Sequence, residues 1–185
     1  MKKFIIIIFV FILSIGAQAQ DVIQLDETRI NFSPTANLVF EDYPNGLVKV
    51  REKFAAQFQS DAIGFTKANF DIHRFLDEAD IKSGDVIVTL RSKKGYLEAT
   101  YDEKGNLLKT SQMFKDIALP ALVRNEVFGE YMGWTMTRNK YQARGISDQL
   151  DNEQYIVVLR KGNDRQRLKI TPSKYDYGVA SIEKF

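Results

Sequence analysis

Glycine-containing turns at 92–95, 102–106 and 162–164 divide much of the chain into short segments rich in β-branched and aromatic residues. Glycine reaches the backbone conformations that tight hairpin turns need, and such segments between turns are typical of β-strands. The pattern therefore predicts two antiparallel three-stranded meanders. Their strands are expected at 85–91, 96–101 and 107–111, and at 134–142, 155–160 and 167–171. Residues 145–152 are expected to form a loop.

Two further stretches repeat apolar residues at the spacing of an α-helix. Residues 52–76 predict a broken helix, with Asp61 capping its second part. The other stretch starts at Pro120 and ends at Gly133. Its apolar stripe consists of Leu119, Leu122, Val123, Val127 and Tyr131.

The order of these elements predicts an α+β fold, an antiparallel sheet with helices packed on one face. One helical stretch followed by three strands occurs twice in this order. A duplication into two helix-plus-three-strand halves, 47–115 and 116–175, is therefore a further hypothesis.

Residues 1–19 have the pattern of a cleavable secretory signal peptide. Two lysines precede an apolar run of about 12 residues, and small residues lie before the expected cleavage point. The run is shorter than the roughly 20 residues that span a bilayer. We expect cleavage between Ala19 and Gln20, followed by an extended segment at 20–46. The mature chain is expected to have neither a transmembrane nor a lipid anchor.

Charge and cysteine content narrow the classes of function. Cleavage removes two of the 26 basic residues and leaves 24 against 24 acidic ones, so the mature net charge is near zero. Electrostatic binding to nucleic acid or anionic lipid is therefore not expected. The chain has no cysteine, which excludes thiol catalysis, thiolate metal sites and disulfides. Together with the signal peptide, these features favour a periplasmic or secreted protein without disulfides.

Few residues suggest catalysis or metal binding. His73 is the only histidine, and the chain has no Gly-x-Ser-x-Gly elbow, P-loop or Gly-x-Gly-x-x-Gly motif. We expect no enzyme, no cofactor and no metal. Two alternatives stay open. Either a solvated loop or a calcium site is formed by Asp148, Asp151, Asn152 and Glu153, and two carboxylates distant in sequence could form a hydrolytic pair.

Aromatic and basic residues on the predicted strands are the candidate binding residues. The aromatic ones are either half-buried packing or, if they share the solvent face, a recognition surface. The basic ones, in the last hairpin, are either a solvated sheet face or a patch for an acidic partner or for lipopolysaccharide phosphate. The candidates are Tyr96, Tyr101, Trp134, Tyr141, Tyr155, Arg165 and Arg167.

The stretch 101–110 (YDEKGNLLKT) resembles the F-D-x-x-G-x-L-x-x-T hairpin of PepSY-like periplasmic proteins. Leu119-Pro120 at a helix start and Gly133-Trp134 before a strand are similar to later parts of that pattern. The resemblance covers residues 86–171 and is closest to exported flavobacterial proteins of undefined activity. It implies a fold like that of β-lactamase-inhibitor proteins over 47–185, and an envelope address, but no functional residues.

These observations favour a non-enzymatic binding or interaction module of the bacterial envelope, whose partner is a protein or an envelope component. One alternative is a structural envelope protein that associates with itself. A second alternative is a hydrolase or transferase that uses Asp and Glu side chains.

Overall fold

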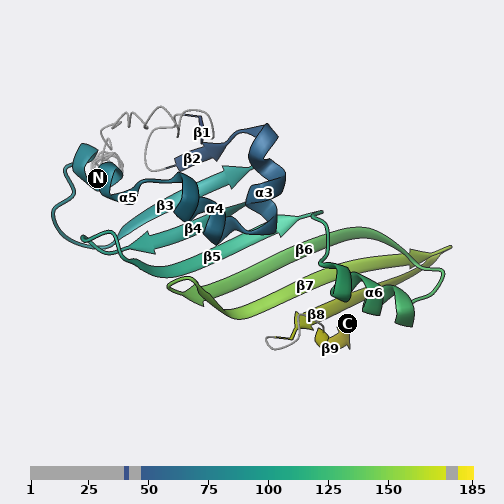
Figure 1. The fold of residues 1–185 in the computed structure, drawn as a ribbon. Helices are drawn as coiled ribbons and strands as arrows, with labels where there is room; N and C mark the ends of the chain where they lie inside the picture. The colour runs from purple at the N-terminus through teal and green to yellow at the C-terminus, as the bar shows by residue number, and fades with distance from the viewer. Residues whose placement is uncertain (1–39, 42–46, 174–178) are drawn as a thin grey trace, which may run out of the picture.

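The computed structural model describes residues 40–41, 47–173 and 179–185, so the predicted signal peptide and nearly all of the 20–46 segment lie outside the described residues. The fold is a mixed α+β fold with a mostly antiparallel sheet (Figure 1). The helices are η2 (Glu52–Phe54), α3 (Ala55–Ser60), α4 (Ala62–Asn69), α5 (Ile72–Glu78) and α6 (Ala121–Glu130). The strands are β1 (Phe40–Glu41), β2 (Leu47–Val50), β3 (Val86–Ser92), β4 (Gly95–Tyr101), β5 (Leu107–Lys115), β6 (Thr135–Ile146), β7 (Gln149–Lys161), β8 (Asp164–Pro172) and β9 (Val179–Lys184).

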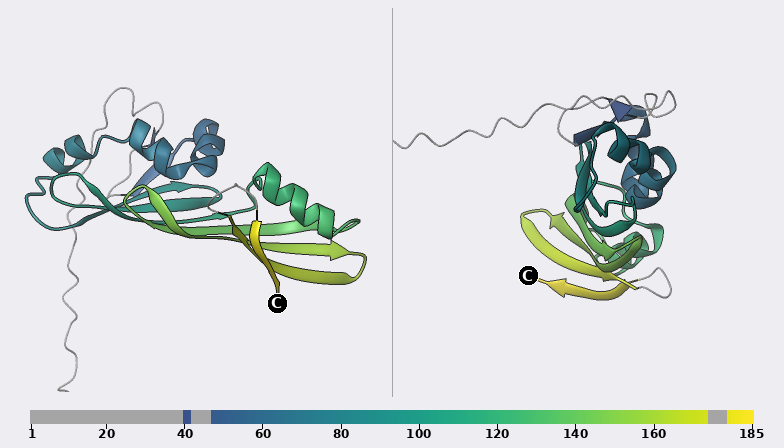
Figure 2. Two further views of the ribbon diagram at one scale, coloured as in Figure 1. Left: turned by 60° about the horizontal axis from the view of Figure 1, so that its bottom comes forward. Right: turned by 90° about the vertical axis from the view of Figure 1, so that its left-hand side faces the viewer.

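The described strands form one sheet in the order β1 to β9, so every strand pairs with its neighbour in sequence. All of these pairs are antiparallel except β2–β3, which is parallel because the chain between them crosses through the helices from η2 to α5. Figure 2 shows a long, strongly twisted sheet, with α3 to α5 over its first strands and α6 over its later ones.

Cross-strand register places the side chains that point toward the helices in continuous rows. One row runs Leu90, Leu97, Gln112, Ala143 and Glu153 from β3 to β7. The neighbouring row on the same face runs Phe114, Tyr141, Tyr155 and Ile170 from β5 to β8. Because side chains alternate between faces of a strand, both rows belong to the same face.

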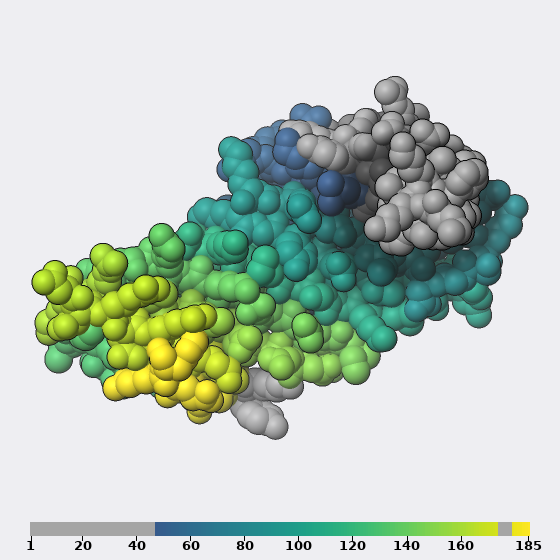
Figure 3. Space-filling view, turned by 180° about the vertical axis from the view of Figure 1, so that it is seen from behind, coloured from purple at the N-terminus to yellow at the C-terminus, as the bar shows by residue number. Residues whose placement is uncertain are grey.

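The helical segment packs on this face through aromatic rings. Phe58 of α3 meets Phe114 of β5 edge-on, with ring centroids 5.4 Å apart, and Phe65 of α4 lies 5.5 Å from Phe58. Phe58 and Phe114 are fully buried, so they are central to the core. The opposite face carries alternate residues such as Ile87 and Ile146, which are 57% and 67% exposed. Figure 3 shows the molecule from behind, where the strands form much of the surface.

Most predicted elements are confirmed. The broken helix at 52–76 is η2 to α5, and Asp61 caps α4 by accepting a hydrogen bond from the Gly64 amide at 2.9 Å. The predicted 145–152 loop is wrong, because β6 continues to Ile146 and β7 begins at Gln149. A register shift after Arg144 lets Gly145 stay paired, and a tight turn with Ser147 at φ 55° replaces the loop. The prediction also missed β9 and the parallel pairing of β2 with β3.

In the part of the chain that the structure describes, no helix combines the length and the apolar character needed to cross a membrane.

Candidate functional site

Two adjoining pockets lie between the α4–α5 segment and the sheet. The first, here called the α5 pocket, has a volume of about 700 Å³ and is lined by α4, α5 and the β4–β5 turn. The second, the tyrosine pocket, also has about 700 Å³ and is lined by α4, the segment before α6 and strands β5 to β7. Lys67 and Asp148 line both. The pockets therefore adjoin at this residue pair, and together they are called the cleft.

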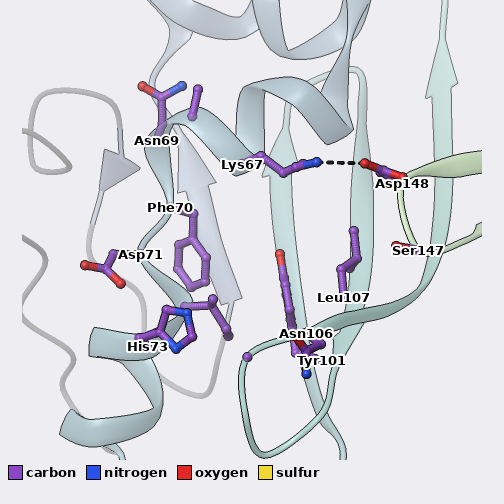
Figure 4. A pocket seen from close by; sticks show the side chains of 13 residues that line it. Lys67, Asn69, Phe70, Asp71, His73, Tyr101, Asn106, Leu107, Ser147 and Asp148 are labelled. Carbon is purple, nitrogen blue, oxygen red and sulfur yellow. Dashed lines mark hydrogen bonds and ion pairs between the residues drawn. The ribbon is translucent and has the colours of Figure 1, made fainter.

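The dividing pair is a salt bridge between elements far apart in sequence. Lys67 Nζ, on α4, lies 2.7 Å from Asp148 Oδ2 in the β6–β7 turn (Figure 4). The hydrogen bond and charge of Lys67 lower the pKa of the Asp148 carboxyl. Both side chains are about half exposed, at 57% and 48%, so the pair adds little to stability. Its effect is to connect the helices to the turn across the cleft.

The floor of the tyrosine pocket comes from the two buried rows of the sheet. Tyr141 and Tyr155 pair directly across β6 and β7, with ring centroids 4.8 Å apart. Burial raises the pKa of both hydroxyls, and the Glu153 carboxylate beside them raises it further. Glu153 therefore lies against both phenols.

Gln112 supplies a second polar group to this floor. It is only 6% exposed, yet it lines the pocket. Ala143 stands between Gln112 and Glu153 in their cross-strand row. Within the described part of the chain, the Gln112 carboxamide makes no hydrogen bond, although its backbone is paired in the sheet. Its oxygen and nitrogen are not among the fully buried polar atoms that lack a partner, so they reach the pocket and are open to a ligand.

The α5 pocket holds the only histidine. His73 is exposed, and Gly105 approaches it so closely that a Cβ at Gly105 would lie 2.7 Å from the imidazole Cε1. Asp71, on the same wall, caps α5 by accepting a hydrogen bond from the Arg74 amide at 3.1 Å. Figure 4 shows His73 and Asp71 on the α5 side of the pocket and Tyr101 and Leu107 on the sheet side.

The predicted aromatic residues do not share one surface. A common solvent face is wrong for Tyr101, Tyr141 and Tyr155, which are 4–7% exposed because the strand alternation turns them toward the helices. Instead they line the two pockets. Tyr96 lies on the opposite face of the sheet, near the Arg91 guanidinium at 5.8 Å. Trp134 packs edge-on against Tyr131 at 6.2 Å, far along the sheet beside α6.

The predicted basic residues lie at the β7–β8 hairpin, away from both pockets. Arg165 and Arg167 are exposed. Arg165 faces Arg160 across the hairpin, and the Arg167 guanidinium lies 4.4 Å from the Phe185 ring. Arg167 is therefore partly engaged within the protein by a cation–π contact.

The candidate calcium loop and the acidic 102–106 turn both have internal partners. In the 102–106 turn, Asp102 accepts hydrogen bonds from the Lys104 and Asn106 amides at 2.9 and 2.8 Å, as a hairpin turn requires. Asp148 pairs with Lys67, while Glu153 enters the tyrosine pocket. Over the described residues, no three His, Cys, Asp or Glu side chains come together as a metal site would need.

Comparisons with family models, with curated proteins and with solved structures found no match to this chain. The resemblance to PepSY-like proteins therefore stays a prediction, supported by the order of its motifs alone. Sequence reasoning missed Lys67 and Gln112. A polar residue at an inward position of β5 is the only local signal for Gln112, and nothing in the sequence joins Lys67 to Asp148.

Proposed function

We propose that the protein is a non-enzymatic binding module of the bacterial envelope that holds a ligand in the cleft between its helices and its sheet. The tyrosine pocket is the main site and the α5 pocket extends it. The observation that carries the proposal is the Gln112 side chain, which lines the tyrosine pocket from a mostly buried position and has no hydrogen-bond partner for its carboxamide in the described chain. A volume of about 700 Å³ lies within the usual range for ligand sites.

We propose that the helices that enclose this cleft all lie on one face of the sheet, in a PepSY-like arrangement. Contacts of both helical regions support this. Phe58 of α3 touches Phe114 on the buried face, and Lys184, in register with buried Leu168, lies 5.2 Å from the Tyr131 ring after α6. This arrangement encloses a cleft on one side and leaves Ile87 and Ile146 on the other.

Binding is favoured over acid–base catalysis by the charges of the carboxyl groups. A general acid of the hydrolase alternative would need a raised pKa. The Asp148 carboxyl, which lines both pockets, has the opposite character, because the hydrogen bond and charge of Lys67 lower its pKa. The envelope location rests on the predicted signal peptide, and isolation of the mature protein with Gln20 as its first residue would support it.

Filling the cleft tests the binding proposal. Ala118 and Ala68 are exposed alanines that line the tyrosine and α5 pockets, whereas Ala56 is an exposed alanine of α3 outside both. Each would be changed to tryptophan and the protein isolated from the cells that make it. Native mass spectrometry should find a bound mass in the unchanged protein and in Ala56→Trp. That mass should be lost in Ala118→Trp and reduced in Ala68→Trp. Equal retention by all variants, or no bound mass in any, contradicts the proposal.

A further inference from the structure

We infer that the tyrosine pocket accepts a cationic nitrogen group, an alkylammonium or a guanidinium, with Glu153 as its counter-ion and Gln112 as a further hydrogen-bond acceptor. The inference rests on the proposed function and adds the chemical class of the ligand. A free amine and a basic side chain of a peptide share this chemistry.

The charges around the pocket favour a cation. Its walls carry three carboxylates, Asp61, Asp148 and Glu153, and one ammonium, Lys67. Lys67 is already bound to Asp148, and Asp61 caps α4. Within the described chain Glu153 forms no salt bridge, and its carboxylate accepts hydrogen bonds from the Tyr141 and Tyr155 hydroxyls. An anionic ligand would meet this surplus of negative charge, whereas a cation would neutralise it.

The surroundings of Glu153 strengthen its interaction with a cation. Glu153 is half-buried, and the adjacent Tyr141 and Tyr155 are 7% and 4% exposed. A charge pair in such a water-poor setting attracts more strongly than one at the surface. Aromatic rings next to a carboxylate also favour cations through their π faces.

Gln112 is the independent polar group that points to a ligand. It lies on β5, two strands from Glu153, with only Ala143 between them in the row. Its buried carboxamide oxygen can accept a hydrogen bond from the same ammonium or guanidinium that pairs with Glu153. One cation bound between the two side chains would give Glu153 a counter-charge and the Gln112 oxygen a hydrogen-bond donor.

The test titrates the purified mature protein with matched probes at low salt. The cationic probes are 1,5-diaminopentane, as a free amine, and the peptide acetyl-Gly-Lys-Gly-amide. Their neutral counterparts are 1,5-pentanediol and the same peptide with norleucine in place of lysine. Calorimetry measures affinity, and NMR follows the side-chain amide of Gln112. Comparing the two cationic probes tells which source of the charge the site prefers.

Three variants make the result specific. Glu153→Gln removes the charge at nearly constant shape and should weaken cation binding roughly ten- to hundred-fold, the usual loss for a hydrogen bond to a charged group. Asp61→Asn removes a peripheral charge while keeping a good helix cap, and should weaken binding less. The control, Glu103→Gln, lies in an exposed turn outside both pockets and should stay within about twofold.

Preferential binding of either cationic probe, with a Gln112 shift that Glu153→Gln abolishes, supports the inference. Equal binding of neutral and cationic probes, or no Gln112 shift at saturation, overturns it. If the cationic probes fail while Ala118→Trp still removes a native bound mass, only the inference falls. If no variant changes a native bound mass either, the proposed function falls with it.

Discussion

At the scale of single residues, the side chain of Asn139 on β6 binds the backbone of the segment that follows β5. It is 6% exposed, and its Nδ2 donates to the Ile117 carbonyl at 2.8 Å while its Oδ1 accepts from the Ile117 amide at 3.2 Å. The Asp116 carboxylate accepts a further hydrogen bond from the backbone N–H of Asn139 at 3.0 Å. The backbone of Asp116 has a φ of 52°. These bonds attach the segment after β5 to β6, next to the tyrosine pocket.

Removing the side-chain carboxamide of Asn139 should lower the free energy of unfolding. In Asn139→Ala both backbone groups of buried Ile117 lose their partner, so the free energy of unfolding should fall by roughly 2–4 kcal/mol. The matched control, Asn125→Ala, lies at an exposed position of α6 and should change stability by less than about 0.5 kcal/mol. Urea unfolding measures both. Equal effects would contradict the role of Asn139.

The Asp102 carboxyl makes the protein sensitive to acid. The Asn106 side chain and the Asn106 and Lys104 amides hold its pKa below the ordinary value of 3.8. The folded state therefore binds this proton less readily than the unfolded state, so the stabilisation is present above pH 3.8 and is lost as the pH falls toward the folded pKa. Asp102→Asn should lose less stability below that pH than the unchanged protein. An NMR titration that finds the Asp102 pKa at or above its ordinary value would contradict this.

At the scale of elements, Gly95 shows how a turn residue can have a packing role. The sequence places it at the end of a hairpin turn, and the structure places it on β4 opposite Phe114. A Cβ there would lie 2.7 Å from the Phe114 Cα and from its ring carbon Cδ1. The absence of a side chain therefore makes room for the phenylalanine on which α3 packs.

A pair of glycine substitutions tests this role. Gly95→Ala should lower the free energy of unfolding by about 3 kcal/mol, because backbone or ring must move. Gly129→Ala, in α6, has no atom within 4 Å of the added Cβ and should raise stability by about 0.5–1 kcal/mol through helix propensity. Thermal unfolding of the two variants should shift in opposite directions. A shift in the same direction would be evidence against the packing role.

The elements that the sequence predicted correctly depend on local signals. Asp61 begins α4 because its carboxylate accepts a backbone hydrogen bond three residues later, and Gly162, at φ 60°, forms the β7–β8 turn. The elements that it missed depend on distant partners. Strand β2 pairs in parallel with β3 across the intervening helices, and β9 pairs with β8 after residues 174–178. Neither pairing has a local signal.

At the scale of the whole molecule, one hydrophobic cluster runs through both predicted halves. It extends from Val48 of β2 to Ile170 of β8. The β5–β6 pairing, from Lys109 with Ile146 to Lys115 with Lys140, crosses the boundary proposed at residue 115. Continuous packing and strand pairing across this boundary indicate a single cooperative unit.

Unfolding should therefore be a single transition. Trp134 is the only tryptophan and reports on the second half, whereas far-ultraviolet circular dichroism reports on the whole chain. The two signals should give the same denaturant midpoint and slope. Distinct midpoints would show instead that the halves 47–115 and 116–175 unfold separately.

The sequence by itself determined the α+β class, the positions of most helices and strands, and two tyrosines of the candidate site, Tyr141 and Tyr155. Capping, turn formation and side-chain alternation act over a few residues, so they can be recognised in a local pattern. Only the tertiary structure decided that Tyr141 and Tyr155 face a pocket and that Lys67 meets Asp148, 81 residues away. Which face of a strand is covered depends on what packs against it, and that is decided by contacts between distant parts of the chain.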